Sequence, residues 1–134
     1  MKQETILEKY PVFVLEIDKK ETPYQSVDAI FEVLKAAIDK HPIATFIDTF
    51  DHYKHTCSLE SGMVHPDIVD AKNIVFCFGE KLPDPKMLAV RPRSIGVADL
   101  GNHYVISFLE APMQPMNVIM EGWVKALANK EVQS

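Results

Sequence analysis

The sequence predicts an α+β fold: a mixed or antiparallel sheet of about five strands, with two main amphipathic helices packed on one side. Residues 74–78 form an apolar run of β-branched and aromatic side chains, which is typical of a buried strand. Two other segments repeat apolar residues every three or four positions, as amphipathic helices do. Because the chain has 134 residues, we expect a single domain over residues 1–134.

The first third of the chain predicts a strand, a helix and a second strand. Residues 10–17 are apolar on both faces and fit a strand inside the sheet. Residues 22–25 match a capping box, with Pro23 in the first helical position. The helix should cover residues 23–40, because Pro42 disfavours helical geometry in the residue before it. Residues 43–50 predict the second strand, which Asp48 interrupts.

The middle of the chain is expected to be irregular over residues 51–72, with a single helical turn over residues 66–71. Residues 74–78 then predict a central strand covered on both faces, which Gly79 ends. A short helical piece follows, with Asp84 as its N-cap, Pro85 as its first residue and Val90 near its end.

The last third of the chain predicts a β-hairpin and a helix. Strands from residue 93 to 97 and from 103 to 109 flank a turn-rich tetrapeptide at residues 99–102. A second amphipathic helix is expected over residues 115–129. The predicted order is β, α, β, β, short α, β, β, α.

Composition and charge limit the partners. The formal net charge is −5 and the basic residues are scattered, so we expect no nucleic-acid partner. No segment approaches the length of about 20 apolar residues needed to span a bilayer, so we expect no membrane partner. The N-terminus lacks the pattern of a secretory signal, and Cys57 and Cys77 therefore predict reduced thiols in a cytoplasmic protein.

The sequence resembles the domain-of-unknown-function family three-zero-two over residues 12–111. The features that carry the resemblance are the helix with Phe31, Leu34, Ala37 and Ile38, the strand with Ile47 and Asp48, the Phe78-Gly79 pair, the strand after Pro92 and the final strand at residues 104–109. The sequence departs from that family in the histidine-rich segment after Asp48, where a longer helix is expected. The resemblance implies a small α+β fold, often paired as a homodimer, without an established activity or catalytic residues.

A first candidate site is the group His52, His55, Cys57 and His65. Imidazole and thiol groups bind zinc and softer transition metals. In an extended chain His55 and Cys57 point to the same face and His52 does not, so a metal site requires a turn at residues 53–54. The alternative is a polar loop whose histidines satisfy backbone groups.

A second candidate site is Arg91-Pro92-Arg93-Ser94, at the entrance to a strand. Two guanidinium groups and a hydroxyl can hold a carboxylate or phosphate through forked hydrogen bonds. The alternative is pairing with the chain's own carboxylates, such as Glu80, Asp84 or Asp99.

We interpret the protein as a non-enzymatic module that binds a small anionic ligand or forms a dimer. The ligand is expected in a cleft between Arg91, Arg93 and Ser94 on one side and the 52–65 segment, with His55, on the other. The rival hypotheses are an enzyme that uses Cys57 with His52 and His55, a metal-binding protein that uses the same cluster, and an interaction protein that uses the C-terminal helix. The stripe Met113, Met116 and Met120 suits either an adaptable surface or the core. The sequence identifies no cofactor.

Overall fold

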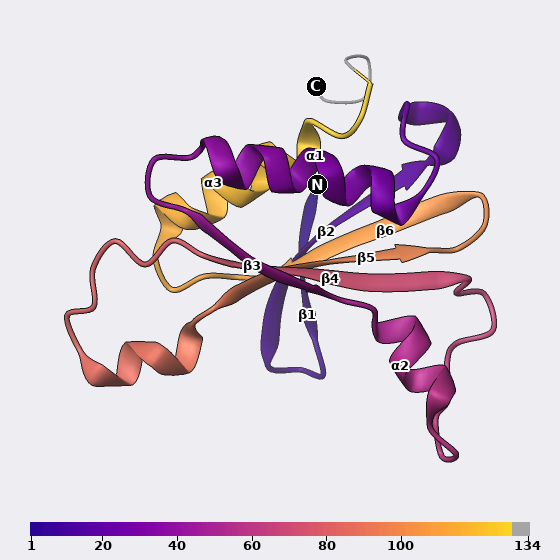
Figure 1. The fold of residues 1–134 in the computed structure, drawn as a ribbon, viewed down its shortest axis with the longest axis horizontal. Coiled ribbons are helices and arrows are strands. Elements are labelled where there is room, and N and C mark those ends of the chain that lie inside the picture. The colour runs from indigo at the N-terminus through magenta and orange to yellow at the C-terminus, as the bar shows by residue number, and fades with distance from the viewer. Residues whose placement is uncertain (130–134) are drawn as a thin grey trace.

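The computed structural model describes residues 1–129 and is organised around one six-stranded sheet (Figure 1). The strands are β1 (Lys2–Ile6), β2 (Tyr10–Asp18), β3 (Thr45–Phe50), β4 (Asp70–Cys77), β5 (Arg93–Asp99) and β6 (His103–Leu109). Their order across the sheet is β1-β2-β6-β5-β4-β3, and every neighbouring pair is antiparallel. The α+β prediction is confirmed, with six strands in place of about five.

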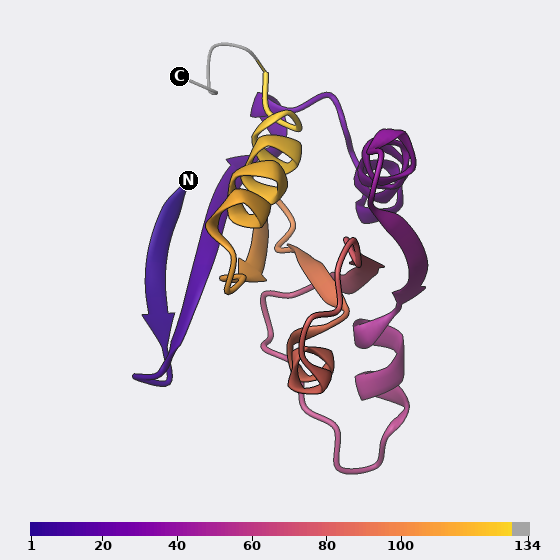
Figure 2. The ribbon, with the colours of Figure 1, turned by 90° about the vertical axis from the view of Figure 1, so that its left-hand side faces the viewer.

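The additional strand is β1, which pairs with β2 through the whole of residues 2–6. All five of its residues are exposed, and its sequence KQETI has no buried apolar face. The hairpin tip places Leu7 and Glu8 at positive φ, of 50° and 62°. The sequence analysis did not predict β1, because this strand is polar and forms by backbone pairing at the edge of the sheet. Figure 2 shows the two edges, β1 and β3, on opposite sides of the molecule.

The two main helices, α1 (Val27–Lys40) and α3 (Gln114–Lys125), cover one face of the sheet, as predicted (Figure 1). The start of α1 differs from the prediction, because Ser26 is the N-cap and its hydroxyl accepts from the Ala29 amide at 3.0 Å. The Thr22 hydroxyl instead donates to the Leu127 carbonyl at 2.6 Å, so it ties the segment before α1 to the residues just after α3. The expected helix over residues 115–129 ends earlier, at Lys125.

The capping box occurs one segment earlier than predicted. The 3₁₀ helix η1 (Lys19–Glu21) has Asp18 as its N-cap, with reciprocal hydrogen bonds between Asp18 and Glu21. An acidic pair thus performs the function that the sequence pattern assigned to Thr22 and Gln25.

Strand β4 lies inside the sheet, between β5 and β3, which confirms the central position of residues 74–78. Ile74 and Phe76 are fully buried under the helices, whereas Val75 and Cys77 on the other face are half-buried. The expectation of full cover on both faces is therefore wrong. Helices α1 and α3 shield only one side, where the main core lies.

The other side of the sheet carries two short helices, α2 (His52–Ser58) and the 3₁₀ helix η2 (Pro85–Val90) (Figure 1). The prediction for η2 is confirmed, since the Asp84 side chain accepts from the Lys86 amide at 2.7 Å. Helix α2 replaces the irregular segment that we expected. The helical turn predicted over residues 66–71 is also wrong, because β4 already begins at Asp70.

The β5–β6 hairpin is confirmed. Its turn contains Gly101 at a φ of 93°, a left-handed conformation that glycine adopts without steric cost. The Asp99 side chain accepts from the Gly101 amide at 2.8 Å and closes the turn.

Candidate functional site: a cationic cavity at the start of β5

The two predicted halves of the ligand cleft lie on opposite faces of the sheet. Side chains alternate along β5, so buried Arg93 shares the helix-covered face with Ile95, and exposed Ser94 points to the other face. The groove that His52 and His65 line has Gly96 and Ala98 in its floor, on the face of Ser94. The predicted cleft that joins the arginines to the histidines is therefore wrong, and Ser94 points away from Arg93.

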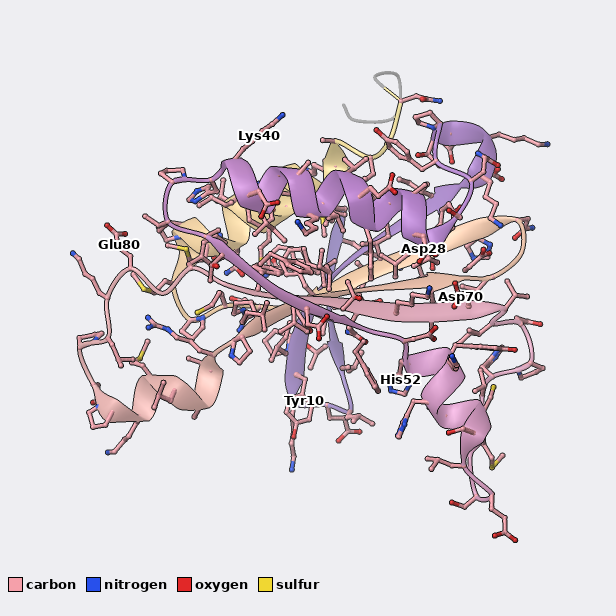
Figure 3. The ribbon with its side chains drawn as sticks, viewed as in Figure 1. Tyr10, Asp28, Lys40, His52, Asp70 and Glu80 are labelled. Carbon is pink, nitrogen blue, oxygen red and sulfur yellow. The ribbon has the colours of Figure 1, made fainter. Side chains whose placement is uncertain are left out.

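Arg91 and Arg93 instead line a separate cavity of about 140 Å³. We name it the cationic cavity, because Lys81 also lines it and Glu80 is the one carboxylate that residues 1–129 contribute to its lining. Most of the remaining wall is apolar and comes from Ile43, Phe78, Met87, Val90, Met113 and Met116. An acidic chain thus gathers three cations around a mostly apolar space. Figure 3 shows Glu80 at the far end of the molecule from His52.

Arg93 is the most distinctive residue of the cationic cavity. Its relative exposure is 9%. One terminal nitrogen, Nη2, donates to the Leu109 carbonyl, and the buried Nε has no hydrogen-bond partner among residues 1–129. Burial lowers the pKa of the Arg93 guanidinium, yet an arginine stays charged at neutral pH. The result is a buried positive charge that is only partly compensated.

Ion pairing, which the sequence offered as the alternative role of this arginine pair, does not occur within residues 1–129. Neither Arg91 nor Arg93 lies within 4.0 Å of a described carboxylate, and the same holds for Lys81. Asp99, which was a candidate partner, pairs with Lys19 at 3.0 Å. An unpaired buried charge costs several kcal/mol, so the position of Arg93 is unfavourable for a cation.

The wall of the cationic cavity is held by a buried amide that the sequence gave no reason to single out. Asn117 is fully buried in α3, and its Oδ1 accepts from the Ala111 amide at 2.7 Å. Its Nδ2 donates to the Ala111 carbonyl and to Gln114 Oε1, both at 3.1 Å. These bonds fix the path of residues 111–113, so the cavity is preformed on that side.

Aromatic packing fixes the inner wall. The rings of Phe78 and Trp123 stack with centroids 5.7 Å apart, and Phe76 meets Trp123 edge-on at 5.6 Å. Phe78 therefore presents a rigid apolar surface to the cationic cavity. The methionine stripe divides accordingly, since Met120 is fully buried in the core while Met113 and Met116 line the cavity.

The histidine segment has a different geometry from the one that a metal site requires. Residues 52–58 are helical, so the extended arrangement considered for His55 and Cys57 is wrong. The His52 Nδ1 lies 2.9 Å from the Thr56 hydroxyl. The Asp67 amide donates to His65 Nδ1 at 3.1 Å, which leaves the proton of a neutral His65 ring on Nε2 and disfavours metal binding there. Within residues 1–129 no three His, Cys, Asp or Glu side chains are grouped to hold a metal ion.

The proposed nucleophile Cys57 is exposed on α2 and forms no hydrogen bond to His52 or His55 in the structure. Two residues correspond to about 200° around an α-helix, so His55 and Cys57 face nearly opposite directions. The His55 ring packs instead against Phe50, with centroids 5.5 Å apart. His55 is also absent from the lining of the cationic cavity.

Sequence reasoning missed Lys81, Cys77 and Met87 of the cationic cavity. One signal was present, because Lys81, Arg91 and Arg93 fall within thirteen residues of an acidic chain, in a segment with three prolines. The remaining lining residues come from distant parts of the chain, and only the fold brings them together.

These features define a small α+β domain with a preformed, mostly apolar cavity whose charged side chains are mainly cationic. The model of a family of unknown function, DUF6858, matches residues 1–129, and the chain belongs to this family. The expectation of a domain-of-unknown-function family is thus confirmed, while the specific resemblance to family three-zero-two stays a prediction. No curated protein matches the sequence. Among residues 1–129, no helix combines the length and apolar character needed to cross a membrane.

Proposed function

We propose that the protein binds a small anion in the cationic cavity and does not transform it. The observation that supports this function is Arg93, a residue with a relative exposure of 9% whose guanidinium has no carboxylate partner within residues 1–129. A bound anion would compensate this charge in a setting of low dielectric, where electrostatic interactions are strong. Arg91 and Lys81 add positive charge to the same space.

The test is saturable thermal stabilisation by anions, measured on wild-type protein and on three single variants. Arg93→Met should abolish the stabilisation, and Arg91→Met should weaken it. Lys54→Met is the matched control, because Lys54 is an exposed cation on α2, away from the cationic cavity, and its variant should respond as the wild type does. Stabilisation that persists unchanged in Arg93→Met would reject the proposal. If Arg93→Met does not fold, Arg93→Lys takes its place in the test, because lysine keeps the positive charge and lacks the planar guanidinium fork.

Self-association is a second candidate function, and exposed apolar side chains around the cationic cavity favour it. Leu82, Leu88 and Met113 are 57%, 61% and 52% exposed and lie on the segments that form the cavity wall or adjoin it. Light scattering across a range of protein concentrations measures the mass directly. A monomer mass at every concentration would reject the homodimer.

We also propose a cytoplasmic location, and the two free thiols agree with it.

A further inference from the structure

We infer that the ligand of the cationic cavity is a small monocarboxylate with an apolar body about the size of a benzene ring. The inference rests on the proposed function and narrows it from anions in general to one chemical class. It follows from the cavity's size, its scarcity of hydrogen-bond donors and its single buried cation.

The size of the cationic cavity limits the apolar body. Its volume is about 140 Å³. An apolar cavity of roughly 150 Å³ holds one benzene molecule. Phe78, Met87 and Met116 surround this space with one rigid ring and two flexible thioethers, which adapt to the outline of an apolar group. A short aliphatic chain or a single aromatic ring therefore fits this volume.

The scarcity of hydrogen-bond donors disfavours phosphate. Among residues 1–129, no Ser, Thr, Asn, Gln, His or Tyr side chain lines the cationic cavity, so the side-chain donors in this part of the chain are Lys81, Arg91 and Arg93. Phosphate presents several strong acceptor oxygens and up to two charges, and protein sites usually satisfy them with backbone amides and hydroxyl groups.

The first turn of α3 also borders the cationic cavity, but it offers few free amides. Pro115 has no N–H, and the Met116 amide already donates to the Met113 carbonyl at 3.0 Å. The usual phosphate site at a helix N-terminus is therefore incomplete here. A carboxylate, which carries one charge and two oxygens in a plane, requires fewer donors.

The charge distribution matches a ligand with one negative group. Arg93 alone is buried, whereas Arg91 is half-buried and Lys81 is exposed. One buried guanidinium pairs well with one carboxylate, which can accept two parallel hydrogen bonds from it. The outer cations would attract the ligand without desolvation of a second negative group.

Cys77 provides a way to observe occupancy of the cationic cavity, because its half-buried side chain lines the wall. Cys57 is exposed on α2 and lines none of this cavity. A ligand in the cavity should protect Cys77 from alkylation and leave Cys57 unaffected. The protein thus contains its own matched control.

The experiment compares benzoate, its neutral analogue benzamide and inorganic phosphate on the wild-type protein. Benzoate should raise the melting temperature saturably and slow alkylation of Cys77 by iodoacetamide at least threefold, with no change at Cys57, as read by mass spectrometry. Benzamide and phosphate should bind at least tenfold more weakly. A tenfold difference corresponds to about 1.4 kcal/mol, a modest demand on one charge-assisted contact.

Each contrary outcome has a distinct meaning. Phosphate that equals or exceeds benzoate in both measurements would overturn the monocarboxylate inference and leave the anion-binding function in place. Benzamide that equals benzoate would overturn both, since binding would then depend on shape alone. Failure of all three to stabilise the protein or to protect Cys77 would also overturn both.

Discussion

Polar side chains lie in opposite environments at the start of β5 and in the histidine segment around α2. At the start of β5, Arg93 is buried, unpaired with any described carboxylate and set in an apolar wall. Around α2, His52, His55 and Cys57 are exposed, and the His52 ring has a partner within its own helix. A buried charge without a counterion is costly, whereas an exposed imidazole is not. The comparison favours one polar group in an unfavourable environment over a cluster of functional residue types in the sequence as the basis for choosing a candidate site.

The largest expected change in the free energy of unfolding separates the rigid wall of the cationic cavity from the histidine segment. Asn117→Leu removes the partner of the Ala111 amide and carbonyl, and should lower the free energy of unfolding by about 2–4 kcal/mol, because buried polar groups lose their hydrogen bonds. His65→Ala removes an exposed ring bonded to the Asp67 amide, and should change it by less than about 0.5 kcal/mol. Urea denaturation measures both. Equal losses of unfolding free energy in Asn117→Leu and His65→Ala would contradict the expected difference between the two regions.

A smaller change in the free energy of unfolding, a gain in place of a loss, is expected for substitution of Arg93 in the absence of ligand. Arg93→Met removes a buried charge that is only partly compensated and keeps much of the side-chain volume, so the free energy of unfolding should rise by about 1 kcal/mol even though the bond to Leu109 is lost. Denaturant titration of the ligand-free protein measures this, with Lys54→Met as a variant that should not change. A loss of about 2 kcal/mol or more in Arg93→Met would show that the charge is well compensated within the protein.

The smallest effect concerns Lys72, a paired cation that contrasts with Arg93. Its ammonium lies 2.7 Å from Asp28 and 3.8 Å from Asp51. The hydrogen bond to Asp28 is the main cause that raises the pKa of Lys72; Asp70 and Asp51 act in the same direction, and burial opposes them. The charged form is therefore favoured in the folded state. The contribution to stability is fully present below the unfolded pKa, near 10.4, and is lost as pH rises through the higher folded pKa.

Lys72→Met should accordingly cost at most about 1 kcal/mol at pH 7, since Asp28 is largely exposed. The difference in unfolding free energy between wild type and variant should shrink above about pH 10.4. Urea denaturation from pH 7 to 11 measures it, and the subtraction cancels titration of Tyr104, whose pKa burial and Asp99 also raise. A constant difference over this range would contradict the proposed ion pairing.

Most of the fold could be predicted because periodicity and turn chemistry are local. Residues 74–78, the β5–β6 hairpin and η2 each follow from neighbouring residues, and each is confirmed. Strand β1 could not be found this way, since its stability comes from pairing with β2. Helix α2 was missed because none of its seven residues is fully buried and its sequence shows no apolar period.

The candidate site could be predicted only in part. The sequence singled out Arg91 and Arg93, but it grouped Arg93 with Ser94, which the alternation of β5 places on the opposite face. Proximity in sequence favoured the histidine cluster, although helical geometry separates its members. The apolar wall joins Ile43, Phe78, Met87 and Met116, and no local pattern relates positions so far apart.

The two edge strands of the sheet affect how copies of the protein can associate. Strand β3 has an irregular register between Phe46 and Asp48, which interrupts the row of outward amides and carbonyls. Strand β1 carries Lys2 and Glu4 on a short exposed segment. Both features hinder strand addition, the route by which open sheets grow into aggregates. Association between copies would therefore be expected to use side-chain surfaces rather than a continuous intermolecular ladder.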